Sequence, residues 1–205
     1  ETEILLYYGK PSPYNVAQEI YIDMIPVTDY ITSGVWQIIL NPTRVVEGQY
    51  DLWLPSENVL NRGTGFLYPD EEVTLTIPST ADKVISVGAY DALTFSYASF
   101  SGRGYTWQDE RTKPDLVAPG VNVRTTAVGG GVTVVSGTSF ATPFVTGASA
   151  LLMEWGIVRG NDPFLYGEKV KAYLRRGARE LPGFGKYPDR EVGYGRLCLE
   201  RSLPD

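Results

Sequence analysis

The sequence contains no histidine and a single cysteine, Cys198, among its 205 residues. One cysteine excludes an internal disulfide and any zinc site built from cysteines, so we interpret Cys198 as a free, buried thiol. The absence of histidine removes the side chain that most often serves as the general base of hydrolytic enzymes. Chemistry that needs an imidazole therefore has to obtain it from polypeptide outside this chain.

Blocks of basic residues are also missing. The chain has 18 basic and 24 acidic residues, a formal net charge of -6, and no basic cluster, which argues against a nucleic-acid partner. The long apolar run at 144–158, FVTGASALLMEWGIV, is short and interrupted, so we expect it not to span a membrane. The N-terminal ETEILLYYGK shows no targeting signal and starts without methionine, in a strand-like segment, as expected for a piece of a longer protein.

Residues 1–77 have the pattern of antiparallel β structure. The segments VWQIIL at 35–40 and QYDLWL at 49–54 alternate their large side chains between two faces, and Asn-Pro and glycine turns separate them. We predict that 1–77 form a β-sandwich or jelly-roll domain. Trp36, Tyr50 and Trp53 are interpreted as core aromatics, with sugar stacking as the alternative.

Residues 78–205 have a different pattern, which predicts an α/β domain. The runs KVISVGAY at 83–90, PDLVAPG at 114–120 and GGGVTVV at 129–135 are nearly continuous and apolar, as in strands covered on both faces. A helix that is small or apolar on nearly every side follows Ser139, and we expect it to be buried in the domain centre. The amphipathic segment at 166–180 predicts a surface helix, with Arg175 and Arg176 on its solvated face.

The junction between strand and helix carries the motif GTSFATP at 137–143. Gly137 permits a tight turn there, and Ser139 then lies near a helix N-terminus, where free N–H groups and the helix dipole stabilise negative charge. We expect Pro143 to lie where its missing N–H costs little. The motif is typical of a nucleophile, and the alternative is that Ser139 is simply an N-cap.

Together with its neighbours, this motif resembles the subtilisin-like serine proteases. The other matching stretches occur in the order of that family: STADKVISVGAYD at 79–91, ASFSGRG at 98–104, KPDLVAPG at 113–120 and VGYGRLCLERSL at 192–203. The resemblance covers most of residues 78–205. It implies that this part is the C-terminal part of a catalytic domain with a three-layer α/β fold.

The resemblance also implies roles for two residues. Ser139 corresponds to the nucleophile and its backbone N–H to one oxyanion donor, with the Thr138 hydroxyl assisting. The family's aspartate, histidine and oxyanion asparagine have no counterpart here, and all three precede the matching region in the family. Asp115 falls in a structural segment and is not a catalytic candidate, and Phe144 replaces a histidine that is not the base in the family.

Some clostridial germination subtilases carry a jelly-roll insertion ahead of the strand that precedes the serine, and residues 1–77 are similar to that arrangement. The resemblance implies a serine endopeptidase in the complete protein and an inactive isolated chain. A pseudoprotease with a regulatory or scaffold role is the alternative. A third alternative is a stand-alone β-sandwich binding module beside an unrelated α/β domain. It would require the long match to the subtilisin-like proteases to be accidental.

Cofactors and partners follow from the same resemblance. No cofactor is predicted, and the structural calcium that subtilases often bind cannot be assigned, because the adjacent acids at 70–72 lack calcium-loop spacing and suit a solvated turn. The expected partners are a peptide substrate and the missing N-terminal half of the domain, with dimerisation or domain swapping where that half is absent. The resemblance implies a secreted, envelope-bound or spore-associated bacterial protein.

Overall fold

The computed structural model describes residues 1–13, 17–46, 48–55, 59–105 and 112–204. The chain divides into two compact units, Glu1–Ser56 and Glu57–Asp205, which we call the N-terminal unit and the serine unit. The predicted boundary at 77 thus differs from the observed one. Residues preceding 77 group with the serine unit because Thr74 and Arg103 exchange hydrogen bonds, with Thr74 N donating to Arg103 O at 2.9 Å.

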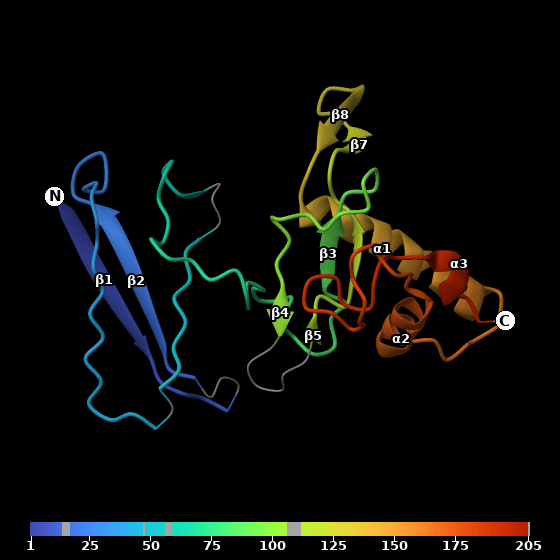
Figure 1. The fold of residues 1–205 in the computed structure, drawn as a ribbon, viewed down its shortest axis with the longest axis horizontal. Coiled ribbons are helices and arrows are strands. Elements are labelled where there is room, and N and C mark those ends of the chain that lie inside the picture. Colours follow the sequence, from blue (N-terminus) through green and yellow to red (C-terminus); the bar gives the residue numbers. More distant parts are fainter. Residues whose placement is uncertain (14–16, 47, 56–58, 106–111, 205) are drawn as a thin grey trace. The chain divides into compact units, whose positions relative to one another are not determined.

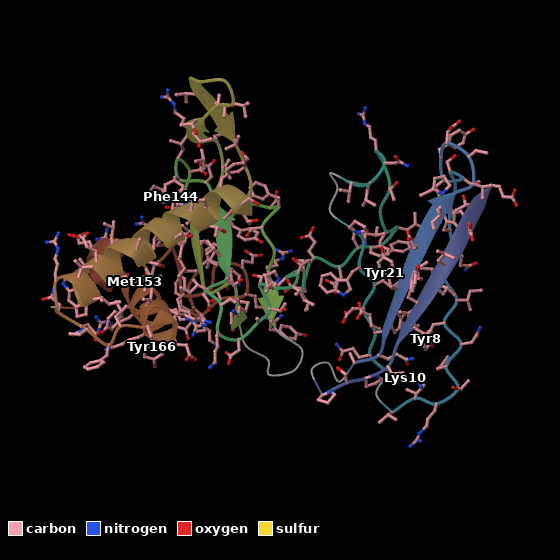
Figure 2. The ribbon with its side chains drawn as sticks, turned by 180° about the vertical axis from the view of Figure 1, so that it is seen from behind. Tyr8, Lys10, Tyr21, Phe144, Met153 and Tyr166 are labelled. Atoms are coloured by element: carbon pink, nitrogen blue, oxygen red, sulfur yellow. The ribbon has the colours of Figure 1, made fainter. Side chains whose placement is uncertain are left out.

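The N-terminal unit contains one antiparallel hairpin. Strand β1 (Thr2–Gly9) pairs with β2 (Glu19–Pro26) in register from Thr2 opposite Pro26 to Gly9 opposite Glu19 (Figure 1). The register gives one face made of six large apolar side chains, Ile4, Leu6, Tyr8, Ile20, Ile22 and Met24. Tyr21, paired with Tyr7, lies on the other face from Tyr8 (Figure 2).

The two strands predicted at 35–40 and 49–54 are absent from the structure, so that prediction is wrong for this chain. Alternating side chains form a strand only where a neighbouring backbone pairs with the segment, and neither segment is paired. The aromatic side chains expected in a core are exposed as well: Trp36 is 47% exposed, Tyr50 68% and Trp53 52%.

The core of the serine unit is a parallel strand pair. Strand β3 (Val87–Tyr90) pairs with β6 (Leu116–Pro119), with Ala89 opposite Ala118. Leu116 and Ala118 pack in the core cluster that contains helix α1, whereas Val117 packs with Leu181 and Val192 in a second cluster. The prediction of two buried strands covered on both faces is therefore confirmed for these segments.

The third predicted strand has a different environment from the one expected. Strand β7 (Val123–Thr126) and β8 (Val132–Val135) form an antiparallel hairpin, and Val132 and Val134 are more than half exposed. The glycines at 129–131 all have positive φ, from 82° to 102°, and they form the turn that sends the chain back along β7. This local pairing explains why the run is a strand without being buried on both faces.

Helix α1 (Thr138–Met153) lies against β3 and β6 (Figure 1), and a π-helical turn, η2 (Glu154–Val158), continues it. The buried positions repeat every three or four residues: Ala141, Val145, Ala148 and Leu152. The prediction of burial on all sides is wrong, because Phe144, Leu151 and Met153 remain 42–52% exposed. Figure 2 labels Phe144 and Met153 along this helix.

The length of this helix also differs from expectation. Residues Thr138–Val158 form a continuous 21-residue helix that by length and composition alone could cross a membrane. Neither Pro143 nor Gly147 interrupts it. Its packing against β3 and β6 gives it the position of a core helix, a kind that passes the same test.

The remaining elements close the serine unit. Strand β4 (Gly104–Tyr105) pairs with β5 (Thr112–Lys113), and helices α2 (Gly167–Gly177) and α3 (Leu199–Ser202) follow. The C-terminal stretch runs beside β6, since Val117 N donates to Gly195 O at 2.9 Å and Leu197 N donates to Val117 O at 2.8 Å. Cys198 is free, as predicted, but only half-buried.

Candidate active site

The turn between β8 and α1 is built on two glycines. Gly137 has φ 150°, in the region that favours glycine, and its N–H donates to Gly120 O at 2.8 Å. A Cβ on Gly120 would lie 2.6 Å from the Cβ of Ala89 and 3.1 Å from Gly137 O. The segment after β6 therefore lies so close to β3 and to the start of α1 that there is no room for a side chain at position 120.

The adjacent turn residues hold the hairpin to this junction. Asn122 N donates to the Ser136 Oγ at 2.9 Å, and Asn122 adopts a φ of 52°. Ser136 follows the last residue of β8 and directly precedes Gly137. This hydrogen bond thus connects the β7–β8 hairpin to the turn that precedes Ser139.

Ser139 is the second residue of α1 and its side chain is exposed. The N-cap is Gly137, and no side chain caps this helix, so the structure does not support the N-cap interpretation of Ser139. The amides of Phe140 and Ala141 donate to Gly137 O at 3.0 and 3.3 Å. The Ser139 amide precedes them in the first turn, where the helix supplies no carbonyl acceptor. It can therefore donate to an external oxyanion.

Thr138 and Pro143 complete the first two turns. Thr138 is half-buried, and its carbonyl accepts the Thr142 hydroxyl at 3.0 Å. Pro143 lies inside α1 beyond the first turn, contrary to the expectation that its missing N–H costs little there. The carbonyl four residues earlier, that of Ser139, consequently has no intrahelical N–H donor.

Asp115, the last acidic residue before the motif in sequence, is fully buried. Its carboxylate accepts the Ser86 amide at 2.7 Å and contacts the side chains of Lys113, Lys171 and Arg175. This environment agrees with a structural role. The three cations around it escaped the sequence analysis, which placed Arg175 on the solvated helix face. The sequence feature that could have indicated this cluster is the pair of charged residues Lys113 and Asp115 on either side of Pro114, next to an apolar run.

Acidic residues elsewhere also have partners. Glu71 and Glu72 form ion pairs with Arg103, which also pairs with Glu191 and lies 5.9 Å from the Tyr97 ring centroid. Across the described ranges, no group of three or more His, Cys, Asp or Glu side chains is placed to hold a metal ion. The segment 70–72 is therefore anchored to Arg103 through the ion pairs of Glu71 and Glu72.

Two cavities of about 370 and 270 Å³ lie in the serine unit, and Ser139 lines neither. The larger is lined by Lys83, Lys113, Lys171 and Arg175 together with Asp82, Glu168 and Ala172. The geometry at Ser139 is thus an exposed hydroxyl at a helix N-terminus, with small residues packed behind it. It places a hydroxyl beside a main-chain amide without an intrahelical acceptor, while the sequence supplies no imidazole to remove a proton from that hydroxyl.

The subtilase family profile, Peptidase S8, matches residues 67–195, which is more than half of the chain. The chain belongs to the subtilase family. The matches support its being the C-terminal part of a subtilase. Serine protease chemistry of the subtilisin type is the activity of the family, and Ser139 lies within the matched residues.

Individual subtilases, one of them of known structure, are also similar to this chain. The structure of the CspB protease of Clostridium perfringens is 45% identical, with a TM-score of 0.85, and the match covers 98% of this chain and 42% of that one. The mouse membrane-bound transcription factor site-1 protease is 39% identical over 134 residues, 63% of this chain and 12% of the relative. Serine protease AprX of Bacillus subtilis is 32% identical over 159 residues, 66% of this chain and 33% of the relative.

This subtilase chain therefore spans between 12% and 42% of the length of these relatives. The relatives also include a protein named as an intracellular serine protease, from Paenibacillus polymyxa, so membership of the family does not by itself indicate a cellular location.

Proposed function

We propose that the protein containing this chain is a subtilisin-like serine endopeptidase in which Ser139 is the nucleophile. The Ser139 Oγ attacks the carbonyl carbon of a peptide bond, its proton passes to a base, and the amine leaves with a proton from the same base. Water then hydrolyses the acyl-enzyme. The supporting observation is the placement of an exposed serine in the first turn of α1, within the GTSFATP motif.

The oxyanion of the tetrahedral intermediate would be bound at the helix N-terminus. The Ser139 amide has no intrahelical acceptor, and the Thr138 hydroxyl is one residue away in the same turn. No acidic side chain lies in this turn to oppose the developing negative charge. A preorganised donor at this place typically contributes a rate factor on the order of 10²–10³.

The base, its orienting aspartate and a second oxyanion donor are proposed to come from polypeptide outside residues 1–205. The sequence has no histidine, so the base cannot come from within, and Asp115 is committed to a buried ion cluster. We further propose that the β1–β2 hairpin belongs to a jelly-roll insertion and that the protein is secreted or attached to a bacterial envelope or spore. Both proposals extend the resemblance of the sequence to the clostridial germination subtilases.

The test is active-site labelling of the full-length protein with a fluorophosphonate probe. Labelling is expected at Ser139, and Ser139→Ala should abolish it while leaving the melting temperature unchanged. The isolated chain 1–205 should remain unlabelled, because removing the base from such a triad costs on the order of 10⁶-fold in turnover. Folded full-length protein that does not label would instead identify a pseudoprotease that keeps the fold without the chemistry.

A further inference from the structure

Three positive charges meet one negative charge at the buried carboxylate of Asp115. Asp115 is 0% exposed, and the side chains of Lys113 and Lys171 beside it are only 1% and 9% exposed. The Nζ atoms of both lysines lie 3.3 Å from a carboxylate oxygen. The Arg175 Nε donates to Oδ1 of the same carboxylate at 2.9 Å. This buried cluster therefore carries two more positive than negative charges.

Main-chain carbonyls of the segment 81–84 hold the two ammonium groups without cancelling their charge. Lys113 Nζ donates to two of these carbonyls, both at 3.1 Å, and Lys171 Nζ donates to two at 2.8 and 2.9 Å. Together with Asp115, these oxygens account for the three N–H groups of each ammonium. The two lysines thus contribute positive charge at this place rather than free hydrogen-bond donors.

A cavity of about 370 Å³ opens beside the buried cluster, and charged side chains make up most of its lining: Lys83, Lys113, Lys171, Arg175, Asp82 and Glu168, with Ala172. Glu168, Lys171 and Arg175 come from one face of α2, because residues three or four apart on a helix are neighbours. With Asp115, four positive side chains face three negative ones. Asp82 and Glu168 are exposed, so water and salt screen their charges more than those of the buried lysines.

Two cationic groups of this lining have donors that the protein does not use. The Arg175 side chain is 28% exposed and donates to Asp115 through Nε and Nη2, and among the described residues none accepts a hydrogen bond from its Nη1. The Lys83 side chain is 76% exposed, and its Nζ lies 3.9 Å from a Glu168 oxygen, which is beyond hydrogen-bond distance. Guanidinium and ammonium groups are the side-chain groups that bind phosphate in proteins.

The pKa of Lys171 indicates that the single carboxylate leaves positive charge uncompensated. Burial lowers the pKa of Lys171 more than the attraction of Asp115 raises it, and the charges of Lys113 and Arg175 lower it further. A negative charge placed in the cavity would therefore be attracted by all three cations. Walls of low dielectric strengthen this attraction, as they do in other clefts lined by one sign of charge.

We propose that this cavity binds a small oxyanion of the phosphate class, held by Arg175 Nη1 and Lys83 Nζ beside the positive charge of the buried cluster. The anion supplies the negative charge that the lining lacks. Since a water occupies about 30 Å³ in the liquid, the cavity has room for the ion together with several waters. The bound anion would join α2 to the segment 81–84 and so stabilise the serine unit. The site does not depend on the proposed peptidase activity.

The experiment measures the melting temperature of the full-length protein in sodium phosphate and in sodium chloride of the same ionic strength. The chloride reference is needed because any salt screens exposed charges. Phosphate at about ten times its Kd should raise the melting temperature by about 2–5 °C above the chloride value. Isothermal titration calorimetry with inorganic phosphate gives the Kd. A titration with glycerol 3-phosphate shows whether the site prefers the free ion or the phosphate of an ester, and either preference supports an oxyanion site.

Two substitutions of exposed side chains locate the site without disturbing the core. Lys83→Gln removes a donor and should weaken phosphate binding about two- to fivefold, the range of an exposed ion pair. Glu168→Gln removes a carboxylate that opposes the anion, so it should tighten binding by a similar factor. A general loss of stability cannot produce changes of opposite sign.

The matched control is Lys186→Gln, at an exposed lysine that does not line the cavity. Its Kd for phosphate should equal that of the wild type. Phosphate that stabilises the wild type no more than chloride does would overturn the site. So would equal phosphate affinities of Lys83→Gln and Glu168→Gln, because the ion would then bind elsewhere in the protein.

Discussion

The backbone N–H of Gly137 donates to the carbonyl oxygen of Gly120 at 2.8 Å, joining the end of β6 directly to the turn that carries Ser139. Gly120 has no room for a side chain, because a Cβ would meet the Cβ atoms of Ala89 at 2.6 Å and Ala141 at 3.3 Å. The position of the serine is therefore fixed by this backbone hydrogen bond together with the close packing of Ala89 and Ala141 around Gly120.

Gly120→Ala should push the serine turn away from β6. We expect a loss of about 1–3 kcal/mol in the free energy of unfolding, as for other overpacked cores. The rate of fluorophosphonate labelling of the full-length protein should fall on the order of 10²-fold, because a displacement near 1 Å at the reacting atom is enough for that.

The matched control for this variant is Gly167→Ala. Gly167 begins α2, and a Cβ there meets nothing within 4 Å. Stability and labelling should be unchanged or slightly improved, since alanine favours a helix over glycine. Equal effects of the two substitutions would contradict the close approach at Gly120.

Thr138→Val tests the proposed assisting oxyanion donor. The substitution keeps the shape of the side chain and removes the hydroxyl one residue before Ser139. Labelling should slow by up to about 10²–10³-fold without a comparable loss of melting temperature. Phe144→His provides the comparison, because Phe144 is 44% exposed on α1 and has no role in the proposed chemistry. Its labelling rate should match the wild type, and slowing at Phe144 alone would place the chemistry elsewhere.

Around the serine, local signals in the sequence were sufficient to predict the turn and the strand before it. The glycine in GTS and the apolar run ending in Ala-Pro-Gly specify the turn and strand β6 through short-range geometry, and both were predicted. At 129–135 the apolar run was read correctly as a strand, but three glycines turned it into an exposed hairpin. Periodicity records which residues are apolar, not which neighbour covers them.

Where the partner is distant or outside the chain, the same reasoning failed. The alternation at 35–40 and 49–54 suits a sheet, yet within the part of the chain that the structure describes no strand pairs with either segment. The helix pattern predicts Arg175 on the solvated face, but its guanidinium group donates to the buried carboxylate of Asp115. Such long-range compensation of charge leaves no mark at the level of a helix pattern.

Asp162 should give the serine unit a pH-dependent stability. Lys169 Nζ donates to its Oδ1 at 2.7 Å and Tyr173 OH donates to its Oδ2 at 3.0 Å. The hydrogen bond from Lys169, more than that from Tyr173, lowers the pKa of Asp162. The lower folded-state pKa means that the stabilisation is complete above the unfolded value near 4 and is lost as the pH falls through the folded value.

The measurement compares urea unfolding at pH 6 and pH 3. Asp162→Asn should be less stable than the wild type at pH 6, and its free energy of unfolding should fall less between the two pH values. Lys169→Met removes the other partner, so its free energy of unfolding should also fall less between pH 6 and pH 3, the change that we call the acid limb. Both variants remove the same interaction, the one between Lys169 and Asp162. The double variant should therefore lose less free energy of unfolding than the sum of the two single losses. An additive loss, or an unchanged acid limb in Asp162→Asn, would show that the pair does not govern this limb.

Leu151→Asp addresses the exposed apolar side of α1. Leu151 is 52% exposed there, near Phe144 along the helix, although its neighbour Leu152 is completely buried. An apolar helix face of this kind is expected to be covered, and polypeptide outside residues 1–205 is the proposed cover, since the match reaches only 42% of the clostridial protease. Alone, chain 1–205 should associate with increasing concentration in light-scattering chromatography, and Leu151→Asp should suppress this association.

The same substitution has the opposite consequence in the full-length protein. There a buried aspartate without a partner would be strongly destabilising, so Leu151→Asp should lower the melting temperature and abolish labelling. Leu93→Asp makes the same chemical change at a residue 84% exposed, on a turn outside α1. It should alter neither association nor labelling. If both aspartate variants behave alike in the short and the full-length chain, the outer side of α1 faces solvent in the complete protein, and the missing half of the domain must pack elsewhere.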